Sequence, residues 1–321
     1  MRYLKRLILS QVILIFPITL MAISPCDEAN NYVAEASYLD DLLHRTQQQA
    51  LLQEALTLCP DHPEAHTHLG NILEKEDNDI LAIYHYQQAL TKRPNYAQAW
   101  VGLGDTYYKQ GQLPLSFDAY LHVCTKHAHA RQRVAELLRD NRYRIADGDR
   151  VLNHQSLSLL YDRKRLQKLH QMANGCRNSH SKTIRAILQP VAVFRQNHFE
   201  DNQSNLMLVS EAQLDELAIV LIDIRAKKIL IRGHSDSQPV QGKTPAKSHQ
   251  LNWQLSRDRA KSVKEALVLR GVIKRRIKTY SYGDSRPLVK GNNKAAWAKN
   301  RRVEIEVSLY IDFQKNQSDQ T

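Results

Sequence analysis

Hydrophobic residues in the C-terminal part of the chain alternate between strand-like and helix-like spacing. Residues 228–232 form a short apolar run between two basic residues, which predicts a buried strand. Residues 254–270 carry apolar side chains at helical spacing and precede Gly271, so they predict an amphipathic helix that stops at this glycine. The same reasoning predicts strands 184–194, 277–282 and 303–309, a helix around 214–221 and a short helix 295–299. The order strand, helix, strand, helix, strand, strand predicts an α/β domain.

Local signals predict where these two longer helices begin. Ser210-Glu-Ala-Gln213 has the form of a capping box, so we expect a helix to open there. Asn252 is suited to cap the helix 254–270. The segment 237–251 before it contains two prolines and Gly242, which predicts a long exposed loop. Such a loop either controls access to a neighbouring cleft or lies beside the cleft without such a role.

Residues 29–126 follow a different pattern, a repeat of helical apolar positions. Two Leu-Gly pairs, ending at Gly70 and Gly104, lie 34 residues apart, and so do Pro60 and Pro94. This period resembles tetratricopeptide repeats (TPR), in which helix pairs stack into one core. The glycines are expected where helices approach, and the large aromatics between them: Trp100, Tyr107 and Tyr120. The resemblance implies a concave face that binds a protein or peptide partner.

The edges of this repeat region are less regular. Residues 29–62 fit a weaker first copy, and the last copy lacks the closing proline. Residues 127–182 are polar and helix-rich, and they predict a helical connector that ends in a linker. His122, Cys124, His127 and His129 cluster near its start, but their spacing does not match a closed zinc site. We therefore expect no metal and no cofactor.

The N-terminus has the pattern of an export signal. Three basic residues precede the apolar run 7–23, so residues 1–24 predict a signal peptide or an uncleaved N-terminal anchor. Pro25 stands directly before Cys26, where a lipoprotein cleavage box requires a small residue, which disfavours lipidation at Cys26. The four cysteines Cys26, Cys59, Cys124 and Cys176 allow two disulfides in three connectivities, which spacing alone leaves open.

The distribution of charge along the chain indicates a class of partner where basic residues are concentrated. The chain has a formal net charge of +12, and residues 185–310 hold about twice as many basic as acidic residues. Lys274-Arg-Arg276 and the pair Arg301 and Arg302 are the densest groups. A basic face attracts polyanions. For an exported protein this favours a membrane surface or an anionic envelope polymer over nucleic acid.

Three motifs near the C-terminus occur together. They are Gly233-His234-Ser235-Asp236, Asn252-x-x-Leu255-Ser-x-x-Arg259-Ala, and Asn300-Arg301-Arg302-Val-Glu-Ile305. In this order they resemble the OmpA-like peptidoglycan-binding domain, the family that includes the peptidoglycan-associated lipoprotein and the flagellar stator B subunit. The resemblance implies an α/β sandwich, a Gram-negative context and a periplasmic location in the cell envelope, in association with the outer or inner membrane.

The residues themselves predict the chemistry of this site. Asp236 follows a buried strand, and Arg259 lies near the start of the next predicted helix. A carboxylate and a guanidinium on one cleft suit a zwitterion, because the first binds an ammonium and the second a carboxylate. The resemblance implies that these two residues hold the diaminopimelate of a peptidoglycan stem peptide. The supporting residues are Gly233, His234, Ser235, Asn252, Leu255, Arg301 and Arg302.

The sequence therefore predicts a multidomain protein: an all-α TPR-like domain followed by an α/β OmpA-like domain. Its expected segments are an export segment 1–24, repeats 29–126, connector 127–182, peptidoglycan-binding domain 183–312 and polar tail 313–321. We expect a periplasmic adaptor that binds peptidoglycan noncovalently and a protein partner. A stator-like or secretion-associated envelope component is the alternative, although residues 7–24 lack the acidic residue of a proton-conducting helix. No catalytic motif predicts an enzyme.

Overall fold

The computed structural model describes residues 24–39, 43–145, 151–176, 191–195, 199 and 203–308. The chain forms two compact units, Met1–His62 and Pro63–Thr321. The expected export segment, apart from residue 24, lies outside the described residues, as do the polar tail and residues 184–190 of the first expected strand.

The first unit is a pair of helices, α1 (Pro25–Tyr38) and α2 (Arg45–Leu58). A disulfide between Cys26 and Cys59 joins them, with a Cα–Cα distance of 4.9 Å. The buried Gln48 side chain donates to the carbonyl oxygen of Leu39 at 3.0 Å. In this bonded state the Sγ atom of Cys26 is not available for a lipid thioether.

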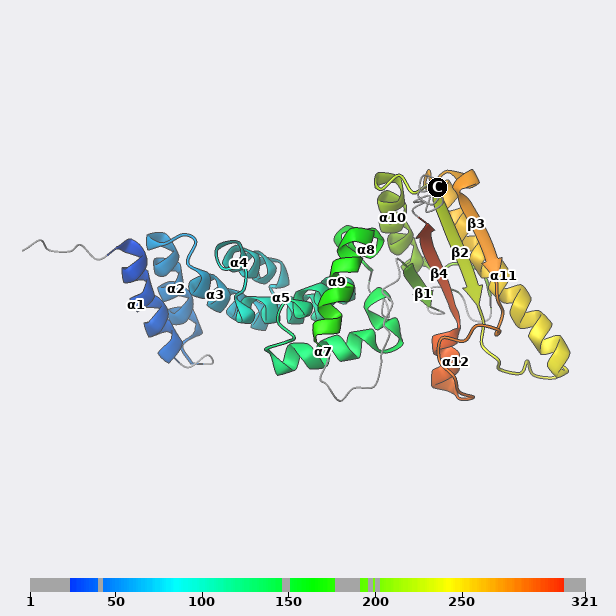
Figure 1. The fold of residues 1–321 in the computed structure, drawn as a ribbon, viewed down its shortest axis with the longest axis horizontal. Coiled ribbons are helices and arrows are strands. Elements are labelled where there is room, and N and C mark those ends of the chain that lie inside the picture. Colours follow the sequence, from blue (N-terminus) through cyan, green and yellow to red (C-terminus); the bar gives the residue numbers. More distant parts are fainter. Residues whose placement is uncertain are drawn as a thin grey trace, which may run out of the picture. The chain divides into compact units, whose positions relative to one another are not determined.

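The second unit begins with helices that continue into the connector (Figure 1). They are α3 (Pro63–Lys75), α4 (Asp79–Lys92), α5 (Ala97–Lys109), α6 (Leu113–Leu121), α7 (Ala128–Leu138), η1 (Arg139–Arg144), α8 (His154–Tyr161) and α9 (Arg163–Gly175). The disulfide Cys124–Cys176 ties the end of α6 to the end of α9. Asp162 separates α8 from α9 and accepts a hydrogen bond from the Arg165 backbone, so it caps α9.

The 34-residue period reflects one packing contact made twice. A Cβ atom added to Gly70 would lie 2.7 Å from the Tyr86 ring, and one added to Gly104 would lie 2.7 Å from the Tyr120 ring. Both tyrosines are fully buried. Each glycine therefore makes room for the tyrosine that follows it by 16 residues, as expected for stacked helix pairs.

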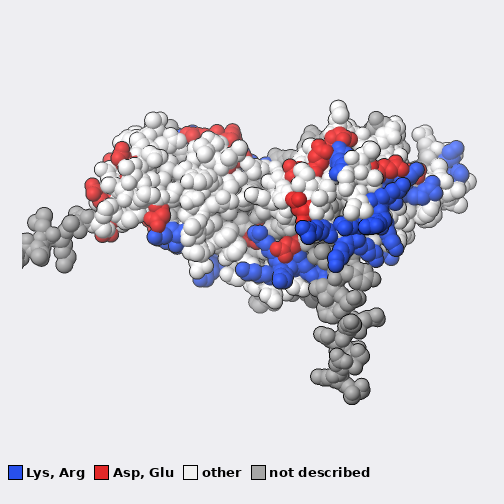
Figure 2. All heavy atoms as spheres, turned by 90° about the horizontal axis from the view of Figure 1, so that it is seen from above, with Lys and Arg blue, Asp and Glu red and all other residues white. Residues whose placement is uncertain are grey.

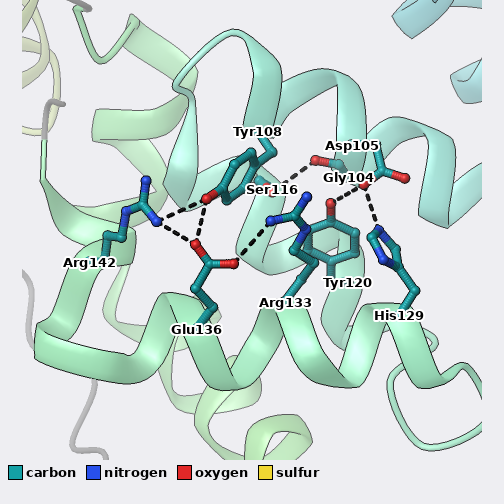
Figure 3. Close-up of polar contacts among 9 residues, drawn as sticks. All are labelled: Gly104, Asp105, Tyr108, Ser116, Tyr120, His129, Arg133, Glu136 and Arg142. Atoms are coloured by element: carbon teal, nitrogen blue, oxygen red, sulfur yellow. Dashed lines mark hydrogen bonds and ion pairs between the residues drawn. The ribbon is translucent and has the colours of Figure 1, made fainter. Parts of the chain in front are cut away.

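Polar contacts join the last repeat to α7 and η1 (Figure 3). Tyr108 donates to the Glu136 carboxylate at 2.6 Å, and Arg133 and Arg142 both pair with that carboxylate. His129 contacts Asp105 at 2.8 Å. This network anchors the connector on the repeat stack through partly buried groups, where ion pairs are screened less than at the surface.

Trp100 differs from the expected interhelical filler, because it is only partly buried. Its ring stacks on His122 with a centroid distance of 3.8 Å, and its Nε1 atom donates to the Pro94 carbonyl at 2.8 Å. The indole is therefore only partly covered, and its polar edge keeps a hydrogen-bond partner.

Acidification from pH 6.5 to about 4 should lower the free energy of unfolding of the repeats. Burial, reinforced by the nearby His66, lowers the pKa of His85 from 6.5 to about 4. The unfolded chain therefore takes up a proton at a higher pH than the folded chain, so stability is full above pH 6.5 and is lost as the pH falls. Because His85 is only half-buried, we expect a loss of about 1–2 kcal/mol. Urea titrations at several pH values give the free energy of unfolding at each pH. This free energy should fall less steeply with decreasing pH in His85→Gln than in the wild type; an equal fall in both proteins would contradict the assignment to His85.

The α/β part contains a four-stranded sheet with helices (Figure 1). Its elements are β1 (Val191–Arg195), α10 (Leu208–Asp223), β2 (Lys228–His234), α11 (Pro245–Leu269), η3 (Lys274–Arg276), β3 (Ile277–Ser281), α12 (Lys294–Asn300) and β4 (Arg302–Ser308). The strand order is β1-β4-β2-β3, with β2 parallel to β3 and β4 antiparallel to both neighbours. The predicted fold class and element order are confirmed.

Two predicted helix starts are wrong. Helix α10 begins at Leu208, so Ser210 is inside it; Gln213 instead uses its amide to bond the backbone of Leu152. Helix α11 begins at Pro245, capped by Thr244, so Asn252 is in its interior and does not cap it. The exposed loop after β2 is correspondingly shorter than expected, and Arg259 lies well inside the helix rather than near its start.

The sheet and the connector share one apolar core. Buried residues of α4, α6, α8, α9, α10, α11 and the strands belong to a single cluster. The buried Tyr161 of α8 donates its hydroxyl hydrogen to the Ile305 carbonyl of β4 at 3.0 Å. Ile145 bridges to Val193 of β1, so the segment after η1 continues the sheet at that edge. This packing holds the domain that carries the candidate site against the connector helices.

Candidate functional site

The candidate site begins where β2 meets α11. A Cβ atom on Gly233 would lie only 1.9 Å from the Ser256 carbonyl oxygen, so a glycine is required for this close approach. The Ser256 hydroxyl lies 3.2 Å from the backbone nitrogen of Gly283 and accepts its hydrogen bond. Ser235 donates its backbone N–H to the Gly283 carbonyl at 2.8 Å. These contacts extend the β2–β3 pairing past the strand end and position Asp236 beyond it.

Asp236 is buried, with 6% of its surface exposed, and each of its carboxylate oxygens accepts a hydrogen bond. Its Oδ1 atom accepts the backbone N–H of Gln238 at 2.6 Å, and its Oδ2 atom accepts Nη1 of Arg301 at 2.7 Å. Asn252 donates to the backbone oxygens of Asp236 and Gln238 at 3.2 and 3.1 Å. Asn252 therefore holds the loop after β2 from the body of α11, a different role from the predicted cap.

Arg259 lies on the same face of α11 as Asn252 and Ser256, because these positions are spaced by four and three residues. Its side chain is almost completely buried. The Nε atom donates to the Gln203 carbonyl at 2.9 Å, and the guanidinium lies over the Phe199 ring, 5.0 Å from its centroid. Phe199, Gln203 and α11 thus hold a buried cation close to the end of β2, where Ala260 approaches Gly233.

Several buried polar atoms around Asp236 lack a hydrogen-bond partner among the described residues. The Ser235 hydroxyl is one, and the Nε atom of Arg301 is another. The indole N–H of Trp297, one turn before Arg301, also has no hydrogen-bond partner among the described residues. An unsatisfied buried polar atom costs about 1–3 kcal/mol, and native structures contain few of them. Three of them in the segments that flank one carboxylate are typical of a site that receives a ligand or water.

A second polar cluster lies on the sheet face beside this site. Glu304 is contacted by Arg302 at 2.8 Å, by His234 at 3.7 Å and by Arg144 at 3.8 Å. Burial by itself raises the pKa of Glu304, but His234 and the two arginines outweigh it and hold this pKa well below its usual range. Burial lowers the pKa of His234. These residues therefore form a structural charge cluster that also links β4 to η1.

The structure brings the predicted residues together in part. Asp236 forms its ion pair with Arg301, not with Arg259. Arg302 turns toward Glu304, and Leu255 is half-buried on α11. Sequence reasoning missed Phe199 and Gln203, which contact Arg259. Nothing in their spacing could have revealed them, because they lie 56 residues or more before the arginine.

The repeats contain a hollow of their own, with a volume of about 390 Å³. Its apolar lining includes Leu90, Pro94, Leu103, Tyr107 and Leu115. Arg165 from α9 and Asp118 from α6 form an ion pair at its wall. An apolar hollow with one charged pair is the usual form of a site for an organic group or a side chain.

Among the described residues, no helix is both long and apolar enough to cross a bilayer.

Family models identify both parts of the chain. Residues 198–301 match the OmpA family, and residues 81–111 match the TPR repeat. The two resemblances predicted from the motifs are therefore confirmed: an OmpA-type domain follows TPR helices. The OmpA match contains the β2 loop, α11 and Arg301, which together form the site described above.

Individual relatives match less than half of the chain. The chain is 28% identical over 154 residues to the peptidoglycan-associated lipoprotein of Buchnera aphidicola, a match covering 48% of this chain and 82% of that protein. It is 36% identical over 122 residues to the peptidoglycan-associated lipoprotein of Pseudomonas putida, covering 37% of this chain and 65% of that protein. The crystal structure of the peptidoglycan-associated lipoprotein from Burkholderia pseudomallei aligns at 27% identity with a TM-score of 0.30, over 37% of this chain and 89% of the other.

Proposed function

We propose that this chain is an exported cell-envelope protein that binds peptidoglycan noncovalently through residues 203–308. The observation that carries the proposal is the buried Asp236 carboxylate, which is paired with Arg301 and follows the unsatisfied hydroxyl of Ser235. Arg259 supplies a second buried guanidinium from α11, the helix that packs against the end of β2. Similarity to proteins named for their association with peptidoglycan supports the same ligand class.

The free end of meso-diaminopimelate carries an ammonium and a carboxylate. In the proposed mode the Asp236 carboxylate, with the adjoining Ser235 hydroxyl, receives the ammonium, and the Arg259 guanidinium receives the carboxylate in a bidentate manner. Arg301 pairs with Asp236 at 2.7 Å. Ligand binding therefore requires the ammonium to share Asp236 with Arg301. This requirement makes the site selective for a zwitterion over a simple cation.

The repeats supply the second half of the proposed function. The hollow between α4, α5, α6 and α9 is apolar with one ion pair, which suits an apolar side chain of a protein partner. Since the repeats and the α/β part share one core, a partner bound there would be held firmly to the peptidoglycan-binding end. The chain would thus act as an adaptor between the cell wall and that partner.

Purified chain from Ser24 onward should co-sediment with sacculi whose stem peptides contain diaminopimelate. It should bind at least about tenfold more weakly to sacculi with lysine at that position, because lysine lacks the carboxylate assigned to Arg259. The supernatant should contain no released muropeptides if the protein only binds. Equal binding to both wall types would contradict the assigned ligand, and released muropeptides would indicate a hydrolase.

A further inference from the structure

The end of the sheet opposite the Asp236 loop carries a surface that the proposed function does not use. Strands β2 and β3 are parallel, with Ile229 beside Ile277, so both begin at this end. The turn after α10 and the η3 segment meet here, and the Arg276 side chain donates to the Ala226 carbonyl across the gap. Strand β2 has seven residues and spans about 23 Å, so this end lies far from Asp236.

Basic side chains gather at this end, which we call the basic tip: Arg225, Lys227, Lys274, Arg275, Arg276 and Lys278. Most of the six are exposed, and none forms an ion pair with a described residue. The neighbouring Arg270 differs, because Glu211 and Asp215 neutralise it. Figure 2 looks down on the side of the molecule where β2 and β3 begin, and Lys and Arg side chains gather over that part. The basic tip therefore carries positive charges that no acidic side chain of the described residues pairs with.

Large apolar side chains project beside these charges. Leu269, at the end of α11, is 87% exposed, and Ile273 and Ile222 are 41% and 47% exposed. Leu269 and Ile273 flank Gly271 in the sequence, and Ile222 lies beside this turn, because a Cβ atom on Gly271 would lie 3.8 Å from its side chain. Aliphatic residues this exposed normally mark a contact surface when they cluster. Here they cluster inside the basic tip.

We infer that the basic tip, with Leu269, Ile273 and Ile222, binds the surface of an anionic lipid bilayer. Lysine and arginine are attracted to acidic headgroups, and apolar side chains between them enter the headgroup–acyl boundary. A soluble polyanion would use the charges but would give Leu269 no apolar environment. Because the Asp236 loop lies at the other end of β2, one domain could contact a membrane and hold peptidoglycan at the same time.

Vesicle co-sedimentation tests this inference with the chain from Ser24 onward, which retains every described element and both disulfides. The protein should pellet with phosphatidylglycerol-containing vesicles and not with phosphatidylcholine alone. The variant Lys227→Gln/Lys274→Gln/Arg275→Gln should lose at least about tenfold in affinity. The matched control Lys243→Gln/Lys290→Gln/Lys294→Gln removes the same charge from exposed positions elsewhere and should change affinity less than about twofold.

Leu269→Ser separates a bilayer from a soluble polyanion. It should weaken vesicle binding severalfold, most visibly at high salt, and leave binding to soluble heparin unchanged. Equal losses in the two triple variants would show attraction by net charge only and would overturn the inference. So would unchanged vesicle binding by Leu269→Ser together with tighter binding to heparin. Sacculus binding by the tip variant should stay at the wild-type level, so failure here is distinguishable from failure of the peptidoglycan site.

Discussion

Gly233→Ala should destabilise the α/β part by about 3 kcal/mol, the largest stability effect we expect of a single methyl group in this chain. The new Cβ atom would meet the Ser256 carbonyl oxygen at 1.9 Å, and backbone at this distance cannot move aside as a flexible side chain could. Either α11 or β2 must shift. The shift would also separate Asn252 from the loop after β2, so we expect weaker sacculus binding by any protein that still folds.

Urea denaturation followed by circular dichroism measures the first effect. Gly175→Ala is the matched control, because that glycine is the last residue of α9 and an added Cβ atom would lie 3.9 Å from the nearest atom outside its own helix. It should change stability by less than about 1 kcal/mol. If Gly233→Ala is as mild as Gly175→Ala, the close approach of β2 and α11 is not what requires the glycine.

Asp236→Asn and Arg259→Lys should each weaken binding to diaminopimelate-containing fragments by about 10- to 150-fold, the equivalent of one hydrogen bond to a charged group. Asparagine can still accept the Gln238 N–H but cannot attract an ammonium. Lysine keeps the charge of Arg259 but not its planar fork, so it cannot bind a carboxylate bidentately. Titration calorimetry with purified muropeptides provides the measurement.

Both residues have structural partners, so folding must be measured beside binding. Arg259 also bonds Gln203 and packs over Phe199, and its loss has a stability cost of its own. Arg257→Lys is the control on the same helix: this arginine is exposed and contacts Trp253 from the surface. It should bind as the wild type does. Folded Asp236→Asn and Arg259→Lys proteins that retain full affinity would show that the ligand is held elsewhere.

Local pattern predicted most elements of the fold because their causes are local. The 34-residue period follows from a glycine that must face a tyrosine 16 residues later, and this contact lies within one helix pair. The start of α11 was also readable from the sequence. Thr244 is a favoured cap residue and Pro245 a favoured first helical residue, and the two together are a stronger signal than Asn252 alone.

The capping box at Ser210 shows why a local motif can fail. The motif is intact in the sequence, but Ser210 and Gln213 are both buried in α10. Gln213 uses its amide for the Leu152 backbone in the connector instead of the helix end. A long-range partner in a buried place outweighs a local one that competes with water.

The sequence by itself determined the element order, the repeat period, the two families and the identity of the chemical groups at the site, because each depends on residues close together in the chain. Tertiary structure alone decided which groups meet: Cys26 with Cys59 among three connectivities, Asp236 with Arg301 across 65 residues, and Arg259 with Gln203. Spacing carries no information about such pairs, because they form only where packing brings distant segments together and removes them from water.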